Sequence, residues 1–69
     1  MTDLGALVKR HRNKAGLTQL ELANLAGVGK TTIFDIEKNK ETVLWSNILG
    51  VLRVLNIKVE FNSPLTEKL

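Results

Sequence analysis

Glycines divide the first forty residues of the chain into short segments, and this division restricts the fold more than any other feature. Gly16, Gly27 and Gly29 stand where one helix has to end or the next has to begin. Glycine suits a helix end because it has no Cβ atom and tolerates the left-handed backbone found there. The glycines leave room only for helices of about two to four turns. The first half of the chain is therefore expected to be a series of short helices.

Apolar spacing and capping signals set the limits of the first three expected helices. The first, about residues 4–15, has apolar residues at helical spacing and ends at Gly16. The second covers about residues 19–26, because Thr18 and Glu21 form a capping box, in which each side chain accepts a hydrogen bond from the other residue's amide. The third is expected from Lys30 to about Lys38, capped by Gly29, with isoleucines at 33 and 36 facing inward.

The second half of the chain predicts one more helix and one strand. Ser46 is expected to cap a helix that runs to about Leu55. Trp45 is expected to lie in the core beneath this helix, and a place at an interface is the alternative. Residues 57–61, Ile-Lys-Val-Glu-Phe, alternate strictly between apolar and charged, which is typical of a half-buried strand. Residues 63–69 are expected to form a flexible tail.

The string Gly-Val-Gly-Lys-Thr-Thr at residues 27–32 looks like the end of a phosphate-binding P-loop. A P-loop needs a glycine five residues before its Gly-Lys pair, and a hydrophobic strand that leads into the loop. Asn24 occupies the glycine position, and the polar residues within 19–26 do not suit a buried strand. A chain of 69 residues also lacks room for the parallel sheet that carries such a loop. Nucleotide hydrolysis is therefore not expected.

Composition excludes several other classes of function. The chain has no cysteine and a single histidine, His11, so no thiolate or histidine-rich metal site is expected, and no cofactor. No group of acid, base and nucleophile suggests an enzyme. No apolar run approaches the roughly 18 residues of a membrane span, and the N-terminus lacks the charge-then-apolar order of a signal peptide. We expect a cytoplasmic protein with no membrane contact.

The positive charge is concentrated in one part of the sequence. The net charge is +3, and all of this excess lies within residues 1–40, whereas residues 41–69 are balanced. A one-sided basic region is the electrostatic pattern expected of a nucleic-acid binder, although an ordinary solvated surface is the alternative.

Residues 17–40 resemble the core of the lambda-repressor-like (Xre) family of helix-turn-helix DNA-binding domains. The resemblance rests on a small residue, a turn glycine and three apolar residues at fixed spacing: Ala23, Gly27, Val28, Ile33 and Ile36. It extends over about residues 3–56. It implies an all-α helix-turn-helix domain of four to five short helices over residues 1–56. It also implies a structural ion pair between Arg12 of the first helix and Glu37 of the third.

The resemblance also implies which residues touch DNA. The turn and the start of the third helix would enter the major groove, and base contacts would come from Gly29, Lys30, Thr31 and Phe34. Backbone contacts would come from Gln19, Thr32, Lys38 and Lys40, although Thr32 could instead cap its own helix and either lysine could be a solvated charge. Phe34 departs from the family's habit of a small or polar residue, so it would contact either DNA or another protein.

The single expected strand has no partner within the chain. Its unpaired backbone groups predict a homodimer in which residues 57–62 form a dimerising β-strand, with the two-fold axis at Val59. This register sets Lys58 opposite Glu60 of the mate and stacks Ile57, Val59 and Phe61 on one face. A proline at Val59 would then be expected to remove a hydrogen-bond donor at the centre of the ribbon.

A helix followed by a dimerising strand resembles the HipB-type antitoxins, whose partner is a HipA-like serine/threonine kinase toxin. The resemblance implies a repressor that binds a palindromic DNA operator as a homodimer and neutralises that toxin, in the bacterial cytoplasm and on the nucleoid. Two alternatives stay open at this stage. One is a stand-alone phage-type or housekeeping repressor without a toxin, and the other is a helix-turn-helix module that binds only proteins.

Overall fold

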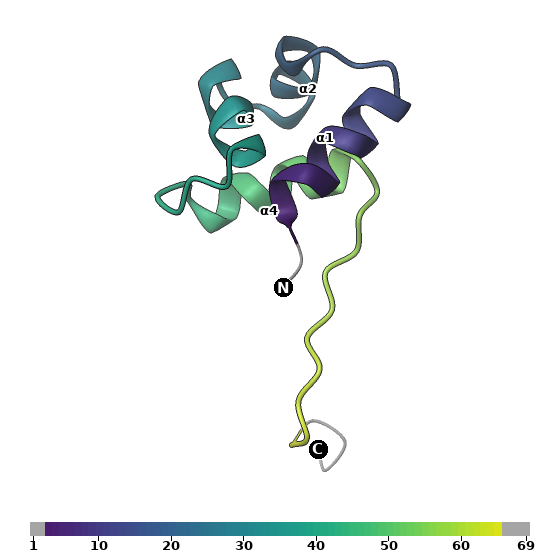
Figure 1. Cartoon of the computed structure of the whole chain (residues 1–69), viewed down its shortest axis with the longest axis vertical. Helices are drawn as coiled ribbons and strands as arrows, with labels where there is room; N and C mark the ends of the chain where they lie inside the picture. The colour runs from purple at the N-terminus through teal and green to yellow at the C-terminus, as the bar shows by residue number, and fades with distance from the viewer. Residues whose placement is uncertain (1–2, 66–69) are drawn as a thin grey trace.

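The computed structural model describes residues 3–65, and they form four helices joined by short loops (Figure 1). The helices are α1 (Leu4–Lys14), α2 (Gln19–Ala26), α3 (Lys30–Glu37) and α4 (Trp45–Val54). The all-helical class and the limits of the first three helices agree with the expectation to within a residue. No helix in residues 3–65 has both the length and the apolar character needed to cross a lipid bilayer.

Local signals account for the ends of α1 and α2. The Asp3 side chain accepts a hydrogen bond from the Ala6 amide at 2.9 Å and so caps the start of α1. The capping box of α2 is complete, with Thr18 Oγ1 accepting from the Glu21 amide at 3.0 Å and the carboxylate accepting from the Thr18 amide at 2.8 Å. Gly27 ends α2 in the left-handed conformation, at a φ of 70°.

The fourth helix differs from the prediction at its beginning. It starts at Trp45, with Leu44 as the N-cap residue, so Ser46 lies inside the first turn and is not the cap. Trp45 was expected in the core, and that prediction is wrong, because the side chain is 49 % exposed. The reason is its place at the first position of α4, where the other helices do not cover it. The buried residues of α4 are Val51 and Leu52, further along the helix.

One apolar core lies where the four helices meet. Its fully or almost fully buried members come from every helix: Val8, Leu22, Ala23, Ile33, Ile36, Val51 and Leu52. Ile33 and Ile36 face inward as their spacing predicted, and the small Ala23 side chain is completely buried. Burial of this kind stabilises the fold by about 1.5–3 kcal/mol for each large side chain.

The first helix is held closely against the end of α3. A Cβ atom added to Gly5 would lie 2.5 Å from the Glu37 carbonyl oxygen. The backbones of α1 and α3 therefore approach more closely at Gly5 than any residue with a Cβ atom would allow. The Gly5 amide donates to Asn39 Oδ1 at 2.8 Å, and Asn39 Nδ2 donates to Asp3 Oδ1 at 2.8 Å. Asn39, at a φ of 60°, therefore joins the loop after α3 to the start of α1.

The chain after α4 leaves the helical body. Asn56 has a φ of 58° and turns the chain, and residues 57–63, which we call the arm, then run away from the helices (Figure 1). No strand forms anywhere in residues 3–65, so the strand expected at 57–61 is not present in the single chain. A strand needs a neighbouring strand to pair with, and this part of the chain supplies none.

Candidate nucleic-acid interface

The turn between α2 and α3 brings the start of α3 to the surface. The Gly27 amide donates back to the carbonyls of Ala23 and Asn24, and the Val28 amide donates to the Ala23 carbonyl at 3.0 Å. The Val28 side chain packs against the core, and Gly29 then caps α3 with an extended backbone. A helix, not a strand, precedes the string Gly-Val-Gly-Lys-Thr-Thr, which is the wrong context for a P-loop.

Four of the predicted DNA-contacting residues line one hollow of about 400 Å³: Gln19, Lys30, Thr31 and Phe34. Lys30 and Phe34 are one helical turn apart on α3, so their side chains share a face. Gln19 comes from the first position of α2, across the turn. The hollow combines an ammonium group, a hydroxyl, an amide and an aromatic ring. These are groups that can contact base edges, thymine methyl groups and phosphates.

Phe34 also borders a second hollow of about 260 Å³, which includes Lys9 and Lys38. The ring is 47 % exposed, and Lys38 Nζ lies 5.5 Å from its centroid, which is a cation–π distance. Phe34 therefore borders both hollows, one together with Lys30 and the other together with Lys38.

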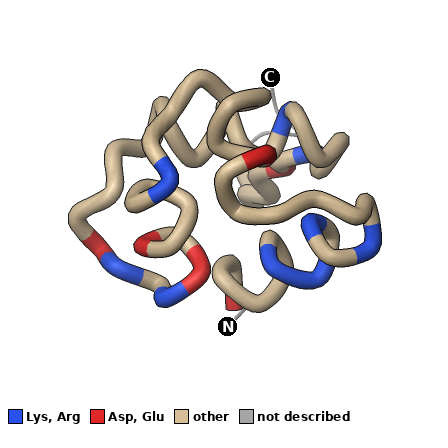
Figure 2. Tube along the Cα trace, turned by 90° about the horizontal axis from the view of Figure 1, so that it is seen from above, with Lys and Arg blue, Asp and Glu red and all other residues tan. Residues whose placement is uncertain are grey.

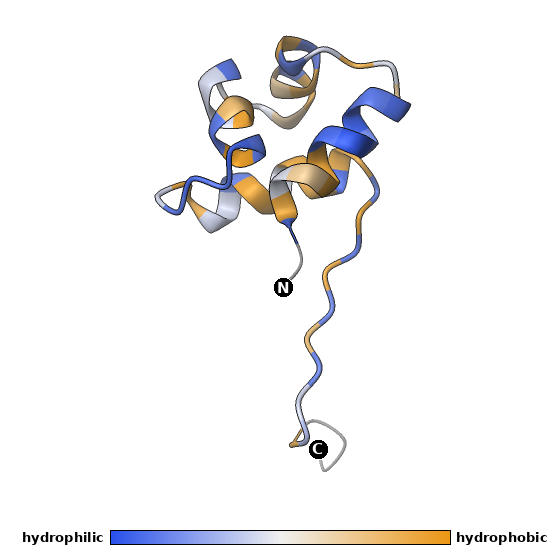
Figure 3. Cartoon of the chain, viewed as in Figure 1, coloured by the Kyte–Doolittle hydropathy of each residue, from blue (hydrophilic) through white to orange (hydrophobic). Residues whose placement is uncertain are grey.

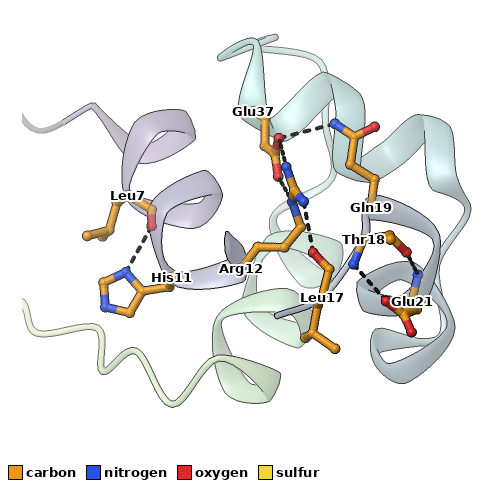
Figure 4. A network of polar contacts seen from close by, with 8 residues as sticks. All are labelled: Leu7, His11, Arg12, Leu17, Thr18, Gln19, Glu21 and Glu37. Atoms are coloured by element: carbon orange, nitrogen blue, oxygen red, sulfur yellow. Dashed lines mark hydrogen bonds and ion pairs between the residues drawn. The ribbon is translucent and has the colours of Figure 1, made fainter. Parts of the chain in front are cut away.

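A network of polar contacts links α1, α2 and α3 beneath this surface (Figure 4). Arg12 Nε donates to Glu37 Oε2 at 2.6 Å and Nη2 donates to Glu37 Oε1 at 3.1 Å, so the pair is bidentate. Arg12 Nη1 also donates to the Leu17 carbonyl at 2.9 Å. Gln19 Nε2 donates to Glu37 Oε1 at 3.1 Å. The ion pair thus orients the Gln19 side chain that borders the first hollow.

The charge of Glu37 is maintained by these contacts. Burial acts to raise the pKa of the Glu37 carboxyl group, but the hydrogen bonds from Arg12 and Gln19 and the charges of Arg12 and Lys9 act in the opposite direction. The balance leaves the pKa of Glu37 below its ordinary value of 4.5. The carboxylate therefore stays ionised and keeps both Arg12 and Gln19 in place at neutral pH.

The remaining predicted contact residues are not all in this region. Gly29 and the half-buried Thr32 lie at the start of α3, beside Lys30. Lys40 lies elsewhere, because its Nζ atom is 3.8 Å from Asp35 Oδ2 and the residue borders a different hollow, one that also includes Asp3 and Glu41. The arm residues predicted to form the dimer interface lie on another part of the molecule (Figure 1).

Sequence reasoning missed Lys9 as a member of this surface. The lysine lies on α1 and borders the second hollow together with Phe34 and Lys38. The signal was available, since Lys9 is one turn before Arg12 and Arg12 was expected to pair with Glu37 of α3. Basic residues colour much of the later part of α1 in Figure 2. Lys9 and Arg12 both border the second hollow, but Arg12 is buried and paired with Glu37, whereas Lys9 is exposed.

A family model described as helix-turn-helix matches residues 8–62 of the chain. The chain belongs to this helix-turn-helix family. It is also 40 % identical over 62 residues to an uncharacterized HTH-type transcriptional regulator, y4mF, of Sinorhizobium fredii strain NGR234. That alignment covers 90 % of this chain and 82 % of the relative.

Membership of the helix-turn-helix family gives the hollows beside α3 a chemical meaning. The family and the relative identify a DNA-binding transcription regulator and not an enzyme. In a helix-turn-helix protein the second helix of the motif is the one that enters the major groove, and here that helix is α3. Lys30, Thr31 and Phe34 are the exposed side chains that it carries at its start.

Proposed function

We propose that this helix-turn-helix regulator is a sequence-specific repressor that inserts α3 into the major groove of its operator. The observation that carries the proposal is the exposed group of Lys30, Thr31 and Phe34 at the start of α3, with Gln19 beside it. Lys30 would donate to guanine O6 or N7, and the Thr31 methyl or the Phe34 ring would contact a thymine methyl. The free amides of the α3 N-terminus would face a DNA phosphate, as helix N-termini favour anions.

Backbone phosphates would be held on both sides of the recognition helix. Gln19 and Thr32 would contact one strand beside the turn, and Lys38 and Lys9 would contact phosphates beside Phe34. Lys40 is a weaker candidate, because part of its charge is already opposed by Asp35. These contacts would set the orientation of α3 but would not distinguish sequences.

Two outcomes separate this proposal from a module that binds only proteins. Replacement of Phe34 with alanine should lower operator affinity and leave the binding of a protein partner unchanged. The exposed Leu25→Ala variant of α2, which borders neither hollow, is a matched truncation and should retain operator affinity. Loss of protein binding with full operator affinity in Phe34→Ala would favour the interaction module. Saturable binding of ATP that is lost in the Lys30→Ala variant would instead support a P-loop at residues 27–32.

The regulator is further proposed to act as a homodimer joined through the arms, with residues 57–62 pairing as antiparallel strands across a two-fold axis at Val59. The support is the alternation of apolar and charged residues along the arm and its separation from the body (Figure 3). Sedimentation should give a dimer whose fraction depends on concentration. A chain that stays monomeric at every concentration would refute this part of the proposal.

The cellular role that fits best is that of a HipB-like antitoxin, located on the bacterial nucleoid, that neutralises a HipA-like serine/threonine kinase toxin. The support is the resemblance of the layout, a helix followed by a dimerising segment, and not a contact surface for the kinase. Co-expression with the product of the neighbouring gene tests it. A stable complex with a kinase-like protein, and relief of its toxicity, is expected. A neighbour unrelated to kinases would favour the stand-alone repressor.

A further inference from the structure

A groove of about 550 Å³ separates the arm from the helical body. Leu4 and Leu7 of α1 and Trp45 and Leu52 of α4 form its wall on the body, and the arm forms the other. Trp45 is the only tryptophan of the chain and is half exposed at the edge of this groove. Exposed apolar surface that is contiguous in this way commonly marks a binding surface. The groove lies away from the surface proposed to bind DNA.

The arm itself has uncovered apolar side chains and unpaired backbone groups. Phe61 is 78 % exposed and Val59 is 38 % exposed, whereas Ile57 packs against the core. Between Lys58 and Asn62, no backbone amide or carbonyl is hydrogen bonded to another residue within 3–65. The chain's own Phe61 therefore does not fill the groove, although it stands at its edge.

The Ile57 amide determines how the arm can pair with another strand. This amide donates to the Leu52 carbonyl of its own chain at 2.9 Å and is not available to a neighbour. In an antiparallel ladder, residues alternate between positions that exchange hydrogen bonds and positions that do not. Ile57 therefore has to occupy a position that does not exchange hydrogen bonds with the other strand, as do Val59 and Phe61. The donors to the other strand are then Lys58 and Glu60.

The two-fold axis at Val59 places Phe61 of the partner subunit directly opposite Ile57. Positions that exchange no hydrogen bonds have the closer Cα separation, about 4.5 Å, so their side chains are in contact. Because Ile57 lies at the body end of the arm and borders the groove, the partner's Phe61 would arrive at the groove mouth. Lys58 and Glu60 would at the same time form two ion pairs with their counterparts on the other face.

We infer that each groove holds Phe61 of the partner subunit, packed against Trp45, and that the ladder is formed by the amides of Lys58 and Glu60. The inference rests on the proposed homodimer and adds its register, its hydrogen-bonding positions and the site of its apolar contact. A second copy is the occupant that fits, because its arm offers an exposed Phe61, unpaired backbone groups, and charges at Lys58 and Glu60 that complement those of the first arm.

The emission of Trp45 tests the groove, since no other tryptophan contributes to the signal. Emission should lie at shorter wavelength in the dimer and move to longer wavelength as dilution produces monomer. Phe61→Ala removes two buried phenyl rings from the dimer, each with an effect of about 10- to 100-fold. It should therefore raise the dimer dissociation constant by at least about 100-fold and expose Trp45. Leu25→Ala on α2, which truncates an exposed apolar side chain outside the groove, should change neither quantity.

A pair of proline variants tests the ladder positions separately. Glu60→Pro removes a ladder donor and should abolish the dimer, whereas Val59→Pro removes only an outward-facing amide and should retain it within a few-fold. Position 60, and not the central position 59, is therefore the sensitive one. Glu60→Gln removes the charge but keeps the amide, and should retain the dimer. Because the arm lies outside the helical body, all three variants should keep the helical circular-dichroism signal.

Each contrary result would refute a different part of the proposal. A monomer at every concentration would refute the homodimer itself. A dimer whose Trp45 emission does not change on dissociation would refute the groove contact and leave the homodimer standing. Greater loss of dimer in Val59→Pro than in Glu60→Pro would refute the assigned ladder positions.

Discussion

At the scale of single residues, the surface around α3 divides into groups that would select a sequence and groups that would only hold the duplex. Lys30 is exposed at the first position of α3 and has no ion-pair partner within residues 3–65. Gln19 Nε2 already donates to Glu37 at 3.1 Å, and this hydrogen bond fixes the orientation of the Gln19 amide group. Replacement of these two residues with alanine should therefore affect DNA binding in different ways.

Lys30→Ala should relax the preference for one base pair in each half-site and cost about 1–3 kcal/mol of binding per half-site. Gln19→Ala should weaken binding to all sequences alike, because a phosphate contact carries no sequence information. Binding measured against operators mutated at each position distinguishes the two results. A uniform loss for Lys30→Ala would make it a phosphate contact instead.

Lys9 should affect the dependence of binding on salt. Each phosphate contact that is lost lowers the slope of log affinity against log salt concentration by about 0.9. Because the proposed homodimer carries two copies of Lys9, Lys9→Ala should reduce the slope by about 1.8, with no change in sequence preference. Lys14→Ala is the control, because Lys14 lies on α1 but borders a different hollow, with Arg10 and His11. Equal slopes for Lys9→Ala and the unchanged protein would remove Lys9 from the interface.

At the scale of helices, signals that act within a few residues were predictable and contacts between distant segments were not. The capping box of α2 and the left-handed Gly27 are local, and both were predicted from the sequence. The close approach of Gly5 to α3 and the exposure of Trp45 depend on how helices far apart in the sequence come together. The face formed by Lys30, Thr31 and Phe34 was also predictable, because one helical turn determines it, whereas Lys9 joins it only through the packing of α1 on α3.

Gly5→Ala should destabilise the fold, because the new methyl group would lie 2.5 Å from the Glu37 carbonyl oxygen and force α1 away from α3. Overpacking of this kind costs about 1–3 kcal/mol. Gly50→Ala is the matched control within α4. Its Cβ would lie 3.7 Å from the nearest heavy atom, and a helical alanine should be neutral or stabilise by up to about 1 kcal/mol. Urea denaturation of both variants measures the difference, and equal stabilities would contradict the close approach.

The link between α1 and α3 should make stability depend on pH. The pKa of Glu37 is lowered in the folded protein, so its contribution is fully present above the ordinary value of 4.5 and is lost as pH falls through the lowered pKa. The free energy of unfolding should therefore decrease on acidification below about pH 4.5. Glu37→Gln should be less stable near neutral pH and show a weaker decrease with acid. An identical acid profile for the variant would mean that Glu37 does not control it.

At the scale of the whole molecule, the proposed two-fold axis should be visible in the DNA. A homodimer presents two copies of α3 related by a two-fold, so its operator should be an inverted repeat with half-sites about one helical turn apart, or roughly 34–36 Å. Insertion of about five base pairs between the half-sites would turn one of them to the opposite side of the duplex. Tight binding should be lost in a gel-shift titration. Unchanged affinity for the lengthened operator would contradict the arm-paired dimer.

The hydrogen bond from the Ile57 amide to the Leu52 carbonyl also determines which changes of length the arm can accept. Insertion of one residue after Ile57 would turn every later apolar side chain to the opposite face and bring charges toward the groove. Insertion of two residues would restore the face but move Phe61 beyond the groove by one repeat of the strand. A longer groove could compensate for an insertion of two residues, but not for an insertion of one residue. Among relatives that dimerise in the same way, arm lengths should therefore differ by even numbers.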